Sequence, residues 1–284
     1  MDISALNDDQ KWELVVAPGT SSKELIDLFN GVDRSDRAMR RAIAEHVNCP
    51  VDLLLAFSSD PGEYHAVRRE SIGNKNFPIS LLHLMADDNK HYFVREGAAK
   101  HPLCPKELLI KLASDACDSV RESVANNQSC PKETLSVLAT DSEVIVRRGA
   151  AFNPTLPIEI LHLLAEDHDW LVRLGVSGHP MYPKKWLFEK LLFDTDDDVR
   201  NSACEYLNEL SQSDWLNIVT GGVSLGMPIS HLPLGCLLGD HLIQHNYVAI
   251  YQSLQSAELA IKAHDISKDV IFGDDQASSQ KLRM

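Results

Sequence analysis

Apolar and polar positions recur along the chain with a period of 26 to 28 residues. Ser22 begins the first copy of this pattern, and a proline begins each of six later copies. These prolines are Pro50, Pro78, Pro105, Pro131, Pro157 and Pro183. Apolar residues follow at the third, fourth and seventh positions, as in Leu108, Leu109 and Leu112. This spacing marks one face of a helix, and proline suits the first helical turn because its missing N–H is not needed there. Each copy is therefore predicted to begin with a helix.

A second element follows in each copy. An acidic residue closes the first helix, and a valine or methionine followed by arginine opens the next element, as in Val120-Arg121. The aspartate lies six residues before the arginine in the last four copies but eight residues before it at Asp60 and Asp87. Small residues then follow the arginine and predict a short second helix that packs close to its neighbours. Histidine or asparagine occupies the sixth position after the arginine and predicts the turn that ends this helix. The residues in this column are His46, Asn74, His101, Asn127, Asn153 and His179.

The repeats define the expected fold class. One copy cannot bury its own apolar face, whereas stacked copies share a continuous core. The sequence therefore predicts an all-α solenoid of about seven repeats over residues 22–209. Residues 1–21 are expected to form an N-terminal cap, and residues 210–273 a C-terminal helical cap or partner segment. Residues 274–284 are expected to form a polar tail.

The stretch from His101 to Asp115 resembles the repeat of the leucine-rich repeat variant family. The element formed by the aspartate and the Val-Arg pair that follows it in each copy, as in Asp115 and Val120-Arg121, is also similar to the second helix of HEAT repeats. The resemblance implies a right-handed superhelix, built either from α-helices alternating with shorter 3₁₀-like helices or from pairs of short α-helices. It also implies ladders of Asp and Arg between copies. The prototype of the family carries an iron–sulfur cluster held by cysteines before its repeats. Since residues 1–20 contain no cysteine, no cofactor is predicted here.

Composition and charge narrow the class of protein. The net charge is −14, which disfavours a general affinity for nucleic acid or anionic membranes. The six cysteines are scattered and do not form a disulfide framework. The acidic start lacks the basic head and apolar run of a secretory signal, and no long apolar run predicts a membrane span. These features predict a cytoplasmic protein.

Candidate catalytic and metal-binding groups have simpler structural interpretations. Cys49, Cys104 and Cys130 share a column with Phe77 and Leu156, which indicates a buried apolar position. The twelve histidines show no metal-ligand spacing. The sequence contains no glycine-rich phosphate loop, nucleophile elbow or CxxC pair. The chain is therefore predicted not to be an enzyme and to bind no metal.

The aspartate and arginine columns are interpreted as a structural ladder, because charged groups in register are stable when they pair between copies. The residues assigned to it are Asp115, Arg121, Asp141, Arg147, Asp167, Arg173, Asp194 and Arg200.

The function predicted from this architecture is that of a protein-interaction scaffold. The solenoid is expected to present an extended concave surface to a protein or peptide, and its acidic charge favours a basic partner. Variable positions on the first helices are the candidate contacts. The residues chosen are Asp52, His83, Glu107, Glu133, Glu159 and His162. Their pattern leaves the oligomeric state open.

The alternative is a HEAT-like nucleic-acid-binding protein or a DNA glycosylase-type enzyme. Such a protein would use the arginine columns as an exposed row, together with aromatic residues such as Tyr64, Tyr92 and Trp170. Extra basic residues beside the columns support this alternative. These residues are Arg41, Arg69 and Arg148. The acidic balance of the repeats argues against it.

Overall fold

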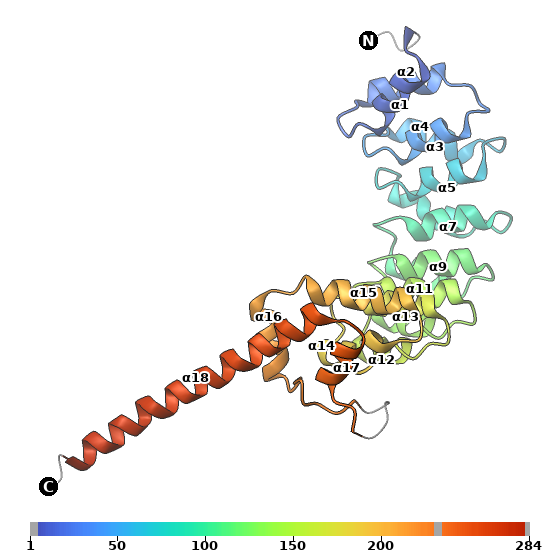
Figure 1. Ribbon diagram of the computed structural model, residues 1–284. Helices are drawn as coiled ribbons and strands as arrows, with labels where there is room; N and C mark the ends of the chain where they lie inside the picture. The colour runs from blue at the N-terminus through green and yellow to red at the C-terminus, as the bar shows by residue number, and fades with distance from the viewer. Residues whose placement is uncertain (1–4, 230–234, 282–284) are drawn as a thin grey trace. The chain divides into compact units, whose positions relative to one another are not determined.

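All regular secondary structure is helical in the computed structural model, which describes residues 5–229 and 235–281 (Figure 1). Side chains are described as far as residue 266. Within these ranges the only β-type pairing is an isolated bridge between Pro228 and Leu237. The all-α class predicted from the repeat pattern is confirmed.

The chain divides into two compact units, Met1–Leu164 and Ala165–Met284, which we call the N-terminal and C-terminal units. In the N-terminal unit, α1 (Asp8–Val16) precedes helices that come in pairs, one pair for each copy of the repeat. The first helices of the copies are α2 (Ser22–Gly31), α4 (Val51–Ser59), α6 (Leu82–Ala86), α8 (Lys106–Leu112), α10 (Lys132–Leu138) and α12 (Ile158–Leu164). The second helices are α3 (Arg37–Glu45), α5 (His65–Gly73), α7 (Tyr92–Lys100), α9 (Asp118–Asn126) and α11 (Val144–Phe152).

The relative lengths of the paired helices correct one prediction. The alternation of α-helices with 3₁₀-like helices implied second helices shorter than the first, yet α7, α9 and α11 have nine residues each, whereas α8, α10 and α12 have seven. Regular alternation of α-helices with 3₁₀ helices is also not found. Within the described residues, named 3₁₀ segments are η2 (Ile79–Leu81) and η3 (Leu191–Phe193). The repeats of the N-terminal unit are thus pairs of short α-helices.

The prolines stand one position earlier than predicted. Pro50, Pro105 and Pro131 are N-cap residues rather than members of the first turn. Their φ angles of −72°, −56° and −59° match the value that the proline ring imposes. The carbonyl group of Pro105 accepts hydrogen bonds from the N–H groups of Leu108 and Leu109 at 3.0 and 3.1 Å. Proline therefore starts each helix through its fixed φ and its carbonyl group.

The apolar columns form the core as predicted. Leu108, Leu109 and Leu112 of α8 are buried, and so are the valines that precede each arginine from Val67 to Val199. Cys49, Cys104 and Cys130 are buried in the column that Phe77 and Leu156 also occupy. Burial raises the pKa of each of these three thiols to about 12. The cysteines are therefore protonated core residues and not reactive groups.

Second helices pack directly against one another along the N-terminal unit, and Figure 1 shows α3, α5, α7 and α9 in succession. Contacts between successive first helices are much sparser. The close approach depends on Gly97, where a Cβ atom would lie 2.8 Å from the carbonyl oxygen of Arg69 and 2.9 Å from Cβ of Ile72. At Gly149 the contact with α9 is less tight, since a Cβ atom would lie 3.2 Å from Cβ of Ala125.

The histidine and asparagine column ends the second helices, as predicted, and has a further role. Asn74 has φ −68° and ψ 134°, an extended conformation that ends α5. Nδ2 of Asn127 donates to the carbonyl oxygens of Ala99 and His101 in the preceding copy, at 2.7 and 2.9 Å. Asn74 and Asn153 make the same two bonds to their own preceding copies. This column thus joins consecutive repeats.

The C-terminal unit contains two further second helices, α13 (Trp170–Ser177) and α15 (Asp197–Asn208). Helix α14 (Lys184–Glu189) and η3 lie between them in sequence. Phe188 of α14 packs against Trp215, which lies on the helix that follows α15, with 6.1 Å between the ring centroids. The remaining helices are α16 (Gln212–Thr220), α17 (Leu238–Gln244) and α18 (Val248–Lys281). Residues 274–281, described from the sequence as a polar tail, continue the backbone of α18, and residues 282–284 lie outside the described range.

Candidate interaction surface

Arginines of the second helices pair with aspartates of the following copy. Arg121 donates to Asp141 through Nε at 2.7 Å and Nη2 at 2.9 Å, which is a bidentate ion pair. Its Nη1 donates to the carbonyl oxygen of Asp115 at 2.8 Å, within its own copy. The pairs Arg95–Asp115 and Arg173–Asp194 repeat this arrangement. Each of these three guanidinium groups is therefore occupied on two edges.

The electrostatics of these pairs keep both partners charged. Burial raises the pKa of the Asp141 carboxyl, but hydrogen bonds from Arg121 and from the N–H of Glu143 outweigh it and leave the pKa below its ordinary value. The pKa values of Asp115 and Asp194 are lowered by the same balance. Hydrogen bonding to Asp141 in turn raises the pKa of Arg121.

The other residues assigned to the ladder also lie along it. Arg147 donates through Nη1 to the carbonyl oxygens of Asp141 and Ser142 at 2.9 and 3.0 Å. The carbonyl oxygen of Asp167 accepts from Arg173 at 2.8 Å. Arg200 donates to the carbonyl oxygen of Asp194 and forms an ion pair with the Asp197 side chain.

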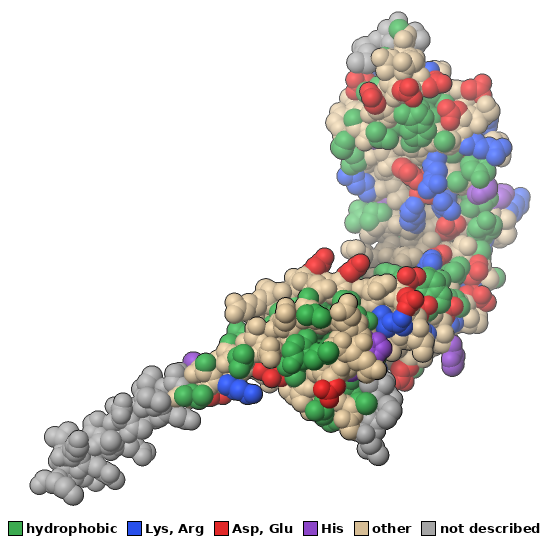
Figure 2. All heavy atoms as spheres, in the orientation of Figure 1, with side chains coloured by type: hydrophobic (Ala, Val, Ile, Leu, Met, Phe, Trp, Pro, Cys, Tyr) green, Lys and Arg blue, Asp and Glu red, His purple; other side chains and the backbone are tan. Residues whose placement is uncertain are grey.

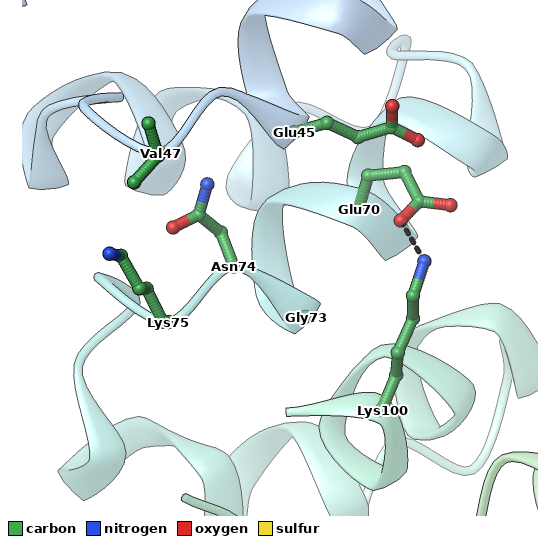
Figure 3. Close-up of a pocket in the computed structure, with 7 residues that line it drawn as sticks. All are labelled: Glu45, Val47, Glu70, Gly73, Asn74, Lys75 and Lys100. Carbon is green, nitrogen blue, oxygen red and sulfur yellow. Dashed lines mark hydrogen bonds and ion pairs between the residues drawn. The ribbon is translucent and has the colours of Figure 1, made fainter. Parts of the chain in front are cut away.

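A second charge network, which the sequence did not reveal, lies along the second helices. The Glu70 carboxylate is buried and is contacted by Arg41, Arg69 and Lys100. Burial raises its pKa, but the hydrogen bonds from Lys100 and Arg69 outweigh burial and lower the pKa overall. Figure 3 shows Glu70 and Lys100 paired at one side of a cavity of about 300 Å³.

The extra basic residues beside the columns are part of this network. Arg69 pairs with Glu96 at 3.1 Å, and Arg148 pairs with Glu122 at 2.9 Å. Burial raises the pKa of Glu96. Because each of these arginines faces a glutamate, the network is internally neutralised and its cavities have no excess of positive charge.

The predicted contact residues lie on the first helices. Asp52, His83, Glu107, Glu133 and Glu159 are exposed, and His162 is half-buried. The second helices pack more closely than the first, and the predicted contacts lie on the row of first helices.

Three of these residues form a regular acidic row. Glu107, Glu133 and Glu159 each follow the N-terminal residue of their helix at equivalent repeat positions, as the second residue after the proline. Within the described part of the chain, none of the three forms an ion pair. The row is thus a set of three exposed carboxylates without ion pairs, two of which follow an exposed lysine in sequence, Lys106 and Lys132.

An exposed apolar row lies beside these glutamates. Leu84, Val137 and Leu163 occupy the sixth position of their copies and are 65%, 67% and 53% exposed. Ile110, one position earlier in its copy, is 54% exposed. Their signal in the sequence is an apolar residue outside the third, fourth and seventh positions that build the core. Figure 2 shows hydrophobic, acidic and basic side chains mixed over the visible face of the N-terminal unit.

Among the side chains described, those of residues 5–229 and 235–266, no group of three or more metal-ligating residues is placed to hold an ion. In the same ranges, no helix combines the length and the apolarity needed to cross a membrane.

Comparisons with known proteins give the following results. No family model matches the chain, and no curated protein matches it. Among solved structures, the chain is similar to a leucine-rich repeat variant described as having a novel repetitive structural motif. The two are 29% identical, the match covers 64% of this chain and 71% of that one, and the TM-score is 0.40.

Proposed function

We propose that the protein is a non-enzymatic interaction scaffold that binds a basic, amphipathic polypeptide segment on the first helices of its N-terminal unit. We call this surface the first-helix face. It comprises Leu84, Glu107, Ile110, Glu133, Val137, Glu159 and Leu163. The observation that carries the proposal is the acidic row without ion pairs beside an exposed apolar row.

The geometry of the helix makes these two rows one surface. Glu133 and Val137 are four residues apart on α10, and Glu159 and Leu163 are four residues apart on α12, so each pair shares a helix face. The pair recurs at the same position of successive copies, two and six residues after the proline. A segment with apolar and basic side chains at matching intervals would cover both rows.

Electrostatics favours this partner class over nucleic acid. Arg95, Arg121 and Arg173 are each held by an aspartate and a backbone carbonyl group, so binding phosphate would break those bonds. The exposed acidic row would repel a polyanion and attract a cationic partner.

The probe is a fluorescently labelled amphipathic helical peptide that has lysines on one face and leucines on the other. We expect wild-type protein to bind it with an affinity that falls as salt rises. The charge-reversal variant E107K/E133K/E159K is expected to bind at least tenfold more weakly and with little salt dependence. Fluorescence polarisation at two salt concentrations measures both effects.

The matched control is E13K/E205K/E209K, which changes the net charge by the same amount at exposed sites outside the first-helix face. If both variants lose the same amount of peptide affinity, the loss comes from the change in net charge, and the assignment of the binding site to this face is contradicted. The apolar row is tested separately with V137S/L163S, since these exposed side chains are not needed for the core.

A further inference from the structure

The arginine ladder is interrupted where the spacing between aspartate and arginine is eight instead of six. In the third copy, Asp87 pairs with Lys111, and Oδ1 of Asp88 accepts from the N–H groups of Lys90 and His91 at 2.8 Å. These carboxylates are therefore turned away from the arginine that precedes them, Arg68. The longer loops of these copies change the arginine column locally.

Arg68 consequently differs from the ladder arginines. Its Nε donates to the carbonyl oxygen of Ser58 at 3.1 Å, and its guanidinium carbon lies 5.2 Å from the ring centroid of Phe93. Among the described residues, no carboxylate pairs with it. Arg68 thus keeps a stacked, uncompensated guanidinium group.

Arg37, one copy earlier, has the same character. Its guanidinium carbon lies 4.6 Å from the ring centroid of Tyr64, and no carboxylate in the described ranges pairs with this exposed side chain. Both arginines line one open cavity of about 680 Å³. We call it the arginine–aromatic cavity. Its walls include Arg37, Tyr64, His65, Arg68, His91 and Phe93.

The acidic side chains at this cavity are already engaged. Glu63 is buried and pairs with Arg40. Asp33 accepts hydrogen bonds from the N–H and hydroxyl groups of Ser35 at 2.7 and 2.6 Å. Arg34, also at the wall, pairs with Asp60. Arg37 and Arg68 are therefore the two wall cations that remain without a counter-ion.

We propose that the arginine–aromatic cavity binds a phosphate monoester. Two uncompensated guanidinium groups match a dianion better than a single carboxylate, and their planar N–H groups suit phosphate oxygens. The aromatic rings behind them restrict the guanidinium groups and offer apolar contact to the carbon side of an ester. This site is independent of the first-helix face.

The surroundings select a single phosphate group over a polyanion. Asp33 lines the same cavity and keeps its negative charge, because its hydrogen bonds come from neutral groups of Ser35, so it would repel further negative charges. The ester could be a free small molecule or a phosphorylated side chain, and both share the same chemistry.

Isothermal titration calorimetry of the full chain tests the site with phenyl phosphate, inorganic phosphate and a phosphotyrosine peptide. We expect saturable binding of phenyl phosphate that is weakened at least tenfold in R37Q and in R68Q. If the phosphotyrosine peptide binds more tightly than phenyl phosphate, the natural ligand is a phosphorylated side chain. If the two bind with equal affinity, the natural ligand is a small phosphate ester. The unphosphorylated peptide is expected not to bind.

R41Q is the matched control, since Arg41 lies on the same helix but pairs with Glu45 and Glu70. It should bind phenyl phosphate within twofold of wild type. Because Arg37 is exposed, R37Q retains the fold even if R68Q does not, and circular dichroism checks both. The proposal is overturned by unchanged affinity in R37Q, by no saturable binding of any phosphate probe, or by preference for an oligonucleotide.

Discussion

Asn127 illustrates how a single polar side chain holds two repeats together. It is 7% exposed, its Nδ2 bridges two carbonyl groups of the preceding copy, and its Oδ1 accepts from the N–H of Ser129 at 2.8 Å. The carbonyl group of Ala99 lies in the last turn of α7, where helical donors run out, whereas that of His101 also accepts from the N–H of Cys104 at 2.9 Å. The asparagine therefore satisfies a helix end at the junction between copies.

Asn127→Ala is expected to lower the free energy of unfolding by about 1–3 kcal/mol, because the carbonyl group of Ala99 loses the donor that Asn127 supplies and that of His101 loses one of two. Urea denaturation followed by circular dichroism measures the change. Gln128→Ala, at the exposed neighbouring position, should stay within about 0.5 kcal/mol of wild type. If Asn127→Ala lowers the free energy of unfolding no more than Gln128→Ala does, the hydrogen bonds of Asn127 do not stabilise the fold.

His101 makes the same column sensitive to acid. Its side chain is fully buried, its Nδ1 accepts from the N–H of Leu103 at 3.1 Å, and burial lowers the pKa of its imidazole. The unfolded chain therefore binds a proton more readily than the folded one. Its stabilising contribution is present above the unfolded pKa of about 6.5 and is lost as pH falls below that value.

We expect His101→Asn to remove this part of the pH dependence between pH 7 and 5, since asparagine occupies the column at Asn74 and Asn127. One proton contributes at most about 1.4 kcal/mol per pH unit, and urea midpoints across the range measure the slope. His83→Asn, at an exposed position, should keep the wild-type slope. An unchanged slope in His101→Asn would place the acid sensitivity elsewhere.

At the scale of the helices, the pairing of elements was predictable and their lengths were not. Leu108, Leu109 and Leu112 reveal a helix through strong periodicity. Gly97, Ala98 and Ala99 give a weak periodic signal because small residues differ little in hydropathy from their neighbours. The second helices therefore looked shorter than they are, although their close packing was correctly inferred.

Gly97→Ala tests that packing. The added Cβ atom would meet a backbone carbonyl oxygen and a Cβ atom of α5 within 3 Å, and neither can move without shifting the helix. We expect a loss of about 1–3 kcal/mol in the free energy of unfolding, measured by urea denaturation. Gly31→Ala, where nothing lies within 4 Å of the new atom, should leave stability unchanged or raise it. Similar losses in both variants would contradict the steric explanation.

The two charge networks differ in how far sequence alone could describe them. Asp141 and Arg121 stand in columns with a fixed spacing, so a ladder between copies was foreseeable. The cluster at Glu70 was not foreseeable, because three cations from different helices converge on one carboxylate only after the copies stack. The same holds for the arginine–aromatic cavity, which depends on what Asp87 and Asp88 bind instead of Arg68.

A double-mutant cycle measures the strength of a ladder step. The bidentate Arg121–Asp141 pair is mostly shielded from solvent, so R121Q and D141N are expected to couple by about 1–2 kcal/mol in the free energy of unfolding. The single contact between Arg148 and Glu122 is more exposed, and R148Q and E122Q should couple by less than about 1 kcal/mol. Coupling energies of equal size in both cycles would show that the ladder pair stabilises the fold no more than the exposed pair does.

At the scale of the molecule, the negative charge is not evenly distributed between paired and unpaired side chains. A net charge of −14 is spread over a chain in which the ladder and the Glu70 network neutralise themselves. The exposed glutamates of the first-helix face contribute to that charge without forming ion pairs among the described residues. Composition alone predicted a basic partner, but the stacking of the helices was needed to find an apolar row beside the acidic one.

A chain of repeats that contact only their neighbours should also respond locally to damage. In the N-terminal unit, each second helix packs on the one before and the one after it, as α9 does on α7 and α11. Stability in such a stack is close to a sum of repeat and interface contributions, so opening spreads from the weakened copy outward.

Leu109→Ala provides the test, because this fully buried side chain lies in the core of α8 and its truncation costs about 2–5 kcal/mol. Hydrogen exchange measured by mass spectrometry should show faster exchange in α7, α8 and α9, with little change in α2 and α3. The exposed neighbour Ile110→Ala should leave all of these helices as protected as in wild type. If Leu109→Ala speeds exchange equally from α2 to α11, the N-terminal unit opens as one cooperative body, and coupling between repeats exceeds their individual stabilities.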